Sequence, residues 1–147
     1  MATGLASPVS ARNQIAGKVA NIQSGTAMSV VTISGSEHQL VSAITNEAVK
    51  ELGLKKDDSV LALIKSTEAM LVKGEIAGAK ISARNKISGR IAGIQKGNAM
   101  ASVTIDAGAL RLTSAVTRQA IDDLQLSNGD AVTALFKATE VVLQKAA

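Results

Sequence analysis

The chain has 147 residues and a formal net charge of +4, a mild basic excess that favours anionic partners without naming one. It contains no cysteine and one histidine, His38, which excludes a disulfide scaffold, a thiolate metal site and an imidazole-rich metal site. Hydrophobic residues make up 46% of the chain, yet Phe136 is its only aromatic residue, so the core must be built from aliphatic side chains.

Five short segments between residues 13 and 73 have the pattern of β-strands. The turn residues Gln23-Ser24-Gly25 separate the first two, and alternation of Val31 and Ile33 with Met28 and Thr32 predicts a half-buried strand. The expected strands are Asn13–Asn21, Ala27–Ser34, Gln39–Ile44, Val60–Lys65 and Met70–Lys73.

One helix is expected between the third and fourth strands. Thr45 suits the N-cap, Glu47 suits the positive end of the helix dipole, and Gly53 suits the C-terminal stop. An apolar stripe supports this helix, formed by Ile44, Ala48, Val49 and Leu52.

The whole pattern then repeats at an offset of 72 residues without insertion or deletion. When residues 10–73 are aligned with 82–145, 31 of 64 positions are identical. The sequence therefore predicts two domains, 10–73 and 82–145, joined by a short linker at 74–81. Domains of about 64 residues are at the small end of what folds alone, so oligomerisation is expected.

The predicted fold class is all-β dominated, with two tandem OB-type barrels, each having five strands and one short helix between strands 3 and 4. Val60–Ile64 is apolar on both strand faces, and so largely is Val132–Phe136. A small barrel covers only its inner face, which indicates an oligomer interface; a fully internal strand is the alternative.

Motifs for catalysis are missing from the sequence, which indicates a protein that is not an enzyme. There is no Gly-x-Ser-x-Gly elbow, no Cys/His pair and no Walker sequence. The acidic pairs at 57–58 and 122–123 do not coincide in the two repeats. His38 aligns with Leu110, so a duplicated function cannot depend on it, and a surface or interface position is expected for it.

The polar positions that coincide are almost all hydrogen-bond donors. Arginine offers a charged planar fork, lysine a point charge and serine a hydroxyl, while a helix N-terminus adds backbone N–H groups. Donors without acceptors suit a fully deprotonated oxyanion. Four of these matched pairs are Ser10/Ser82 and Arg12/Arg84, expected on one strand face, Lys65/Lys137 at a strand end, and Thr45/Thr117 before the helix.

Three segments occur in the same order in both repeats. They are Ser-Ala-Arg-Asn-x-Ile, then Ser-Ala-Ile/Val-Thr before the helix, then Leu-Ile/Phe-Lys-Ser/Ala-Thr-Glu. This arrangement resembles the Mop domain of the molbindins, and the resemblance covers nearly the whole chain apart from the tail and the linker.

The resemblance implies OB-fold domains, a homotrimer of two-domain chains, and cytoplasmic storage of molybdate, with tungstate as an analogue. It implies that the metal is bound as the oxyanion at interfaces between units. One wall of each site would be Ser10, Arg12, Lys65 and Ser66, or Ser82, Arg84, Lys137 and Ala138. The other wall would be Ser42, Ala43 and Thr45, or Ser114, Ala115 and Thr117, from a neighbouring unit. Asn13 and Asn85 are candidates for additional sites on a symmetry axis.

Two other functions remain open at this stage. An OB-fold nucleic-acid binder fits the pI of about 9.6, but such proteins stack bases on aromatic side chains, and this chain has one. An oxyanion-sensing module of a regulator or transporter would use the same domain. The single aromatic residue therefore argues against a nucleic-acid partner. No segment approaches the ~20 apolar residues of a membrane span, and residues 1–10 lack a signal-peptide pattern, so a cytoplasmic protein without a membrane partner is expected.

Overall fold

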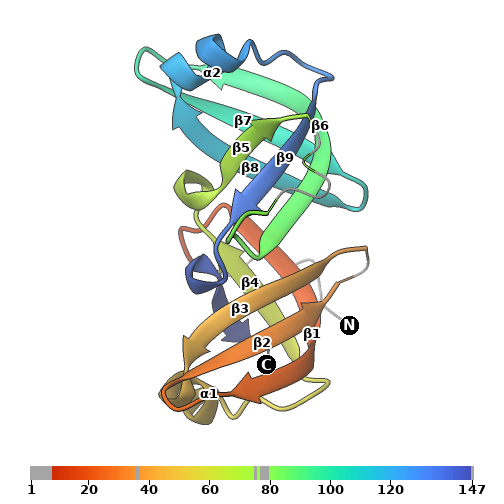
Figure 1. Cartoon of the computed structure of the whole chain (residues 1–147), viewed down its shortest axis with the longest axis vertical. Coiled ribbons are helices and arrows are strands. Elements are labelled where there is room, and N and C mark those ends of the chain that lie inside the picture. Colours follow the sequence, from red (N-terminus) through yellow and green to blue (C-terminus); the bar gives the residue numbers. More distant parts are fainter. Residues whose placement is uncertain (1–7, 36, 75, 77–79, 147) are drawn as a thin grey trace.

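Two five-stranded antiparallel sheets form most of the molecule, one in each half of its long axis (Figure 1). The computed structural model describes residues 8–35, 37–74, 76 and 80–146. The predicted tail therefore lies largely outside the described residues, and so does half of the predicted linker. The strands of the first repeat are β1 (Asn13–Ser24), β2 (Met28–Ser34), β3 (Gln39–Thr45), β4 (Ser59–Ile64) and β5 (Met70–Lys73). Those of the second are β6 (Asn85–Lys96), β7 (Met100–Ala107), β8 (Leu110–Thr117), β9 (Ala131–Phe136) and β10 (Val142–Lys145).

Both helices lie where the local sequence predicts them, at opposite ends of the molecule (Figure 1). In α1 (Asn46–Leu52) the Thr45 hydroxyl accepts a hydrogen bond from Ala48 N at 3.1 Å, and Gly53 ends the helix at a φ of 60°. In α2 (Arg118–Leu124) Thr117 caps Ala120 N in the same way. Gln125 takes the glycine's place at a φ of 52°, a left-handed conformation that costs about 1 kcal/mol or more without glycine.

The last strand of each repeat belongs to the sheet of the other repeat. The strand orders are β10-β4-β1-β2-β3 and β5-β9-β6-β7-β8. After β4 the chain turns through η1 (Ser66–Glu68) and crosses to the second sheet, and after β9 it turns through η2 (Ala138–Glu140) and crosses back. Each half therefore has the expected five strands, but four come from one repeat and the fifth comes from the other.

Lysine side chains hold both exchanged strands at their far ends. Lys145 at the end of β10 donates to Gly53 O at 3.0 Å and lies 3.4 Å from Asp58 Oδ2, both in the first repeat. Lys73 at the end of β5 donates to Gln125 O at 3.0 Å and lies 3.8 Å from Asp130 Oδ2. The same lock thus occurs twice, 72 residues apart.

The exchange explains why β4 is apolar on both faces. This strand is internal, paired with β1 on one side and β10 on the other. Val60, Ala62 and Ile64 point into the core and are at most 2% exposed, whereas Leu63 lies on the outer face beside Val142. β9 is internal too, between β6 and β5.

An apolar outer face nevertheless remains in both halves. Val142 is 59% exposed beside Leu63, and its counterpart Met70 is 51% exposed beside Leu135. Leu63 and Leu135 are themselves buried. β4 and β9 are therefore internal strands, and exposed apolar side chains lie beside them. The two explanations offered for their apolar sequence, an internal strand and an oligomer interface, do not exclude each other.

Candidate oxyanion-binding site

The candidate serine and arginine donors lie just before a strand rather than on one. β1 begins at Asn13 and β6 at Asn85, so Arg12 and Arg84 occupy the bends that lead into them. Both arginines are exposed, and so are Ser10 and Ser82. The expectation of a shared strand face was wrong, because the strand pairing starts one residue after each arginine.

An asparagine next to each arginine joins the two repeats. Asn13 Nδ2 donates to Thr113 O at 2.8 Å, and Thr113 N donates to Asn13 Oδ1 at 2.7 Å. Asn85 makes the same pair of bonds with Val41, at 2.9 and 2.8 Å. Both asparagines are at most 3% exposed. Each amide thus imitates a strand's backbone and pairs with β8 or β3 of the other repeat.

These contacts are a use of the asparagines that the expectations from sequence do not include. A role of Asn13 and Asn85 at sites on a symmetry axis stays a prediction, whereas their amides bond to backbone within one chain. The signal was in the sequence, because a polar residue retained in both repeats directly before an apolar strand is suited to pairing as well as to binding.

The serines of the Ser-Ala-Ile/Val-Thr segments also join the repeats. Ser42 Oγ donates to Val141 O at 2.6 Å, and Ser114 Oγ donates to Ala69 O. Both side chains are fully buried. Since a serine hydroxyl has one proton to donate, these two hydroxyls are already engaged in positioning the segments. Their predicted role as anion ligands stays a prediction.

Thr45 and Thr117 keep a proton available. Each hydroxyl oxygen accepts the bond from its helix, so its O–H can still donate to an anion. Each threonine, however, lies four residues further along its strand than the asparagine anchor at Val41 or Thr113, a rise of about 13 Å in extended backbone. Within one chain, the anchors therefore do not bring these threonines to the arginines.

The lysines follow the internal strands directly. Lys65 precedes η1 and Lys137 precedes η2, and both side chains are exposed. Because Asn13 pairs with Ile64 in the sheet, Arg12 and Lys65 flank the same end of that pair, and Arg84 and Lys137 do so in the second half. None of these four cations forms an ion pair with another residue in the described part of the chain.

The anchors gather the candidate residues into two groups, each with contributions from both repeats. The asparagine and serine bonds bring the arginine and lysine ends of one repeat to the Ser-Ala-Ile/Val-Thr strand of the other. The first group contains Ser10, Arg12, Lys65 and Ser66 with Ser114 and Ala115. The second contains Ser82, Arg84, Lys137 and Ala138 with Ser42 and Ala43. Thr117 and Thr45 lie further along the same strands and are outside the groups that one chain forms.

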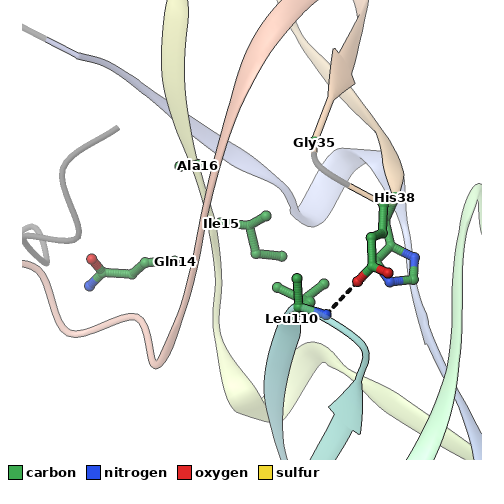
Figure 2. A pocket seen from close by; sticks show the side chains of 8 residues that line it. Gln14, Ile15, Ala16, Gly35, His38 and Leu110 are labelled. Carbon is green, nitrogen blue, oxygen red and sulfur yellow. Dashed lines mark hydrogen bonds between the residues drawn. The ribbon is translucent and has the colours of Figure 1, made fainter. Parts of the chain in front are cut away.

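The repeats also meet at a pocket away from these donors. It has a volume of about 260 Å³ and lies between β1, the β2–β3 turn and the β7–β8 turn (Figure 2). His38 lines it, half-buried, and its Nε2 donates to Ala107 O at 3.0 Å, which confirms the expected interface position. Glu37 lines it too and accepts a bond from Ala109 N.

Neither group of donors contains a clustered set of metal ligands. Among the described residues, no three His, Cys, Asp or Glu side chains lie together in a way that could hold a metal ion. No helix in the described part of the chain is long and apolar enough to cross a membrane. The arrangement can offer cationic and hydroxyl donors to an anion, and it positions them on backbone supplied by both repeats.

This fold and the twofold repetition define a class of small binding domains. The TOBE domain family matches residues 9–71 and 81–143, and the chain belongs to this family.

Similarity to individual proteins extends over nearly the whole chain. The molybdenum transport protein ModE of Herbaspirillum seropedicae is 37% identical over 138 residues, which are 91% of this chain and 50% of that protein. Molybdenum-pterin-binding protein 1 of Clostridium pasteurianum is 41% identical over 66 residues, which are 44% of this chain and 96% of that protein. The chain spans about half the length of the longer relatives, whereas a single repeat spans the clostridial one.

A solved structure of the cytoplasmic molybdate-binding protein ModG, with molybdate bound, has the same architecture. Its TM-score is 0.90 at 30% sequence identity, and the match covers 95% of this chain and 100% of that chain. The fold, including both halves, is therefore shared with a two-domain binding protein.

Proposed function

We propose that the protein binds molybdate without catalysis and stores it in the cytoplasm, with tungstate as an analogue ligand. The observation that carries this proposal is the end-to-end structural match with molybdate-bound ModG, made by a chain whose matched polar residues are mostly donors. ModG and the molybdenum-pterin-binding relatives are binding proteins by name, which supports a protein that is not an enzyme.

The chemistry of the two groups suits a tetrahedral dianion. An arginine and a lysine supply two positive charges, and hydroxyl and backbone donors complete the coordination of oxygens that carry only lone pairs. In this proposal Arg12, Lys65 and Ser66 bind the anion in the first group, and Arg84 and Lys137 bind it in the second. Ser42 and Ser114 hold the second wall in place through Val141 and Ala69.

A homotrimer is part of the proposal. We place the interface at the outer face of the internal strands, where Val142 and Met70 are exposed beside Leu63 and Leu135. A neighbouring chain seated there would bring Thr45 or Thr117 to a site that one chain leaves open. No nucleic-acid or membrane partner is included.

Regulation is the second candidate function. It is favoured by the match to ModE, a protein about twice as long as the matched region, in which the tandem repeat is one part of a larger chain. The same oxyanion site would then act as a sensor. Binding is common to both functions, and only the consequence differs.

Calorimetric titration of the full chain with molybdate, tungstate and sulfate tests the proposal. Molybdate and tungstate are expected to bind, and sulfate is expected to bind at least tenfold more weakly because its shorter bonds leave it too small for the same donors. Absence of measurable molybdate binding at millimolar anion would refute the proposal, and equal affinity for sulfate would reduce it to a general anion site.

A further inference from the structure

Most contacts between the repeats occur twice and therefore cannot distinguish one repeat from the other. The asparagine anchors, the serine anchors and the lysine locks each have a counterpart 72 residues away. The exchanged strands are also equivalent, because β5 pairs with β9 as β10 pairs with β4. All these bonds would form equally well if a first repeat were paired with the first repeat of another chain.

The turn contact has no such counterpart among the described residues. Glu37 in the β2–β3 turn accepts a bond from Ala109 N, a bond marked by the dashed line in Figure 2, and His38 donates to Ala107 O. Glu37 and Ala109 are 72 positions apart, so each occupies the other's place in the repeat. The two turns therefore meet at the pseudo-twofold axis, and only one of them carries the polar side chains.

We propose that this turn contact makes pairing of the repeats heterotypic: a first repeat accepts a second repeat and rejects another first repeat. The partner that the Glu37 turn contacts is thus the second repeat of the same chain. The proposal rests on the contacts between repeats and does not depend on the proposed molybdate function.

Pairing of two first repeats would place Glu37 opposite another Glu37. Two carboxylates brought together at this axis repel each other, although Glu37 is exposed and solvent weakens the repulsion.

Pairing of two second repeats would remove the contact. The matching positions carry Ala109 and Leu110, which offer neither the carboxylate nor the imidazole. The bonds to Ala109 N and Ala107 O would then be lost on both sides. The mixed pairing is therefore favoured over one alternative by repulsion and over the other by lost hydrogen bonds.

A double-mutant cycle in the full chain tests the axis contact. Ala109→Glu is expected to lower the ratio of folded to unfolded protein by at least tenfold. The decrease should be much smaller when Glu37→Ala is also present. Ala109→Gln is the matched control, since it has the size without the charge, and the open pocket beside the turns leaves room for it. Additive effects of the two substitutions, or an equal loss with Ala109→Gln, would overturn the proposal.

Engineered cysteines test pairing itself, because the natural chain has none. Leu71 lies opposite Ala134 in the observed pairing, and Ala62 occupies the place of Ala134 in the first repeat. In a Leu71→Cys/Ala62→Cys chain, a disulfide between β5 and β4 can therefore form only when the first repeats of two chains pair with each other. Leu71→Cys/Ala134→Cys is the positive control for a bond within one chain. On oxidative refolding, the Leu71→Cys/Ala62→Cys chain with native turns should give little covalent dimer. Addition of Glu37→Ala/His38→Leu to that chain should increase the amount of covalent dimer several-fold. Abundant dimer with native turns, or no increase with the altered turns, would show that the turn does not select the partner.

Discussion

Most contacts between the two repeats occur in both halves of the molecule, whereas the contact between the turns on the pseudo-twofold axis occurs once among the described residues. Asn13 and Asn85 make identical pairs of bonds, and Ser42 and Ser114 make equivalent ones. The turn carrying Glu37, by contrast, faces a turn without a matching side chain. Duplicated contacts thus provide the stability of the pairing, and the unmatched contact provides its selectivity.

Glutamate on the outer face should give the largest effect. Val142→Glu, or its counterpart Met70→Glu, is expected to dissociate the proposed trimer, because a buried unpaired carboxylate costs several kcal/mol at each symmetric interface. Both residues are more than half exposed in the single chain, so the fold should survive. The buried Leu63 and Leu135 beside them are poorer choices.

Sedimentation or native mass measurement, with circular dichroism as the control for folding, gives the result. An unchanged oligomer with both substitutions would exclude this face as the interface and leave the trimer without its structural support.

Removal of one asparagine anchor should destabilise the chain strongly. Asn13→Ala leaves the N–H and C=O of Thr113 without their Asn13 partners, at up to about 1–3 kcal/mol for each partly buried group. Asn85→Ala should cost a similar amount if the halves are equivalent here. Urea denaturation of both variants measures the comparison, and a large difference between them would break the equivalence.

Removal of one arginine should divide the sites into two populations. Arg12→Ala is expected to weaken the sites of the first group by about 1.5–3 kcal/mol, and Arg84→Ala those of the second, because each removes one charged donor. Titration with molybdate should then show half the sites with unchanged affinity. Equal loss at every site would mean that the sites are coupled or that the arginine is structural.

Substitution at Ser66 or at Ala138 should remove the difference in affinity between the two groups. Ser66→Ala removes a hydroxyl from the first group and is expected to weaken binding there by about 1 kcal/mol, whereas Ala138→Ser should strengthen the second group. Each change makes the two groups more alike, so two affinities should merge into one. Two affinities that persist in both variants would place the difference elsewhere.

The smallest effect is expected at the Asp58 lock. Its pKa is lowered by the hydrogen bond from Lys55 N and then by the charge of Lys145. The ionised carboxylate is therefore favoured in the folded chain, so its contribution is present above the ordinary pKa of 3.8 and is lost as pH falls through the lowered value.

A comparison of acid denaturation in the native chain and a Lys145→Met variant measures this effect. The variant should lose part of the difference in stability between pH 6 and pH 3. Parallel pH profiles would show that Lys145 contributes nothing to that pKa.

The sequence predicts the helices and most strands because their signals are local. Thr45 and Gly53 act through neighbouring backbone, and alternation in β2 reports burial directly. Strand exchange has no local signal, since β5 has the same apolar pattern in either sheet. The similarity of the repeats conceals the exchange, because β4 and β9 offer β5 equivalent edges.

The candidate site is predicted only in part for a related reason. A retained polar residue can bind a ligand or join the repeats, and the sequence cannot separate the two uses. Ser42 and Asn85 bond to the opposite repeat, whereas Arg12 and Lys65 remain exposed.

The central claim is that the assembled chain holds molybdate at sites made from both repeats. Native mass spectrometry of the full-length protein, with and without molybdate, tests it most directly by giving chain number and bound anions together. We expect a trimer that retains several molybdate anions, and Arg12→Ala/Arg84→Ala should keep the trimer and lose those bound at the two groups. A native assembly that retains no molybdate, or a double variant that retains as much as the native protein, would contradict the account.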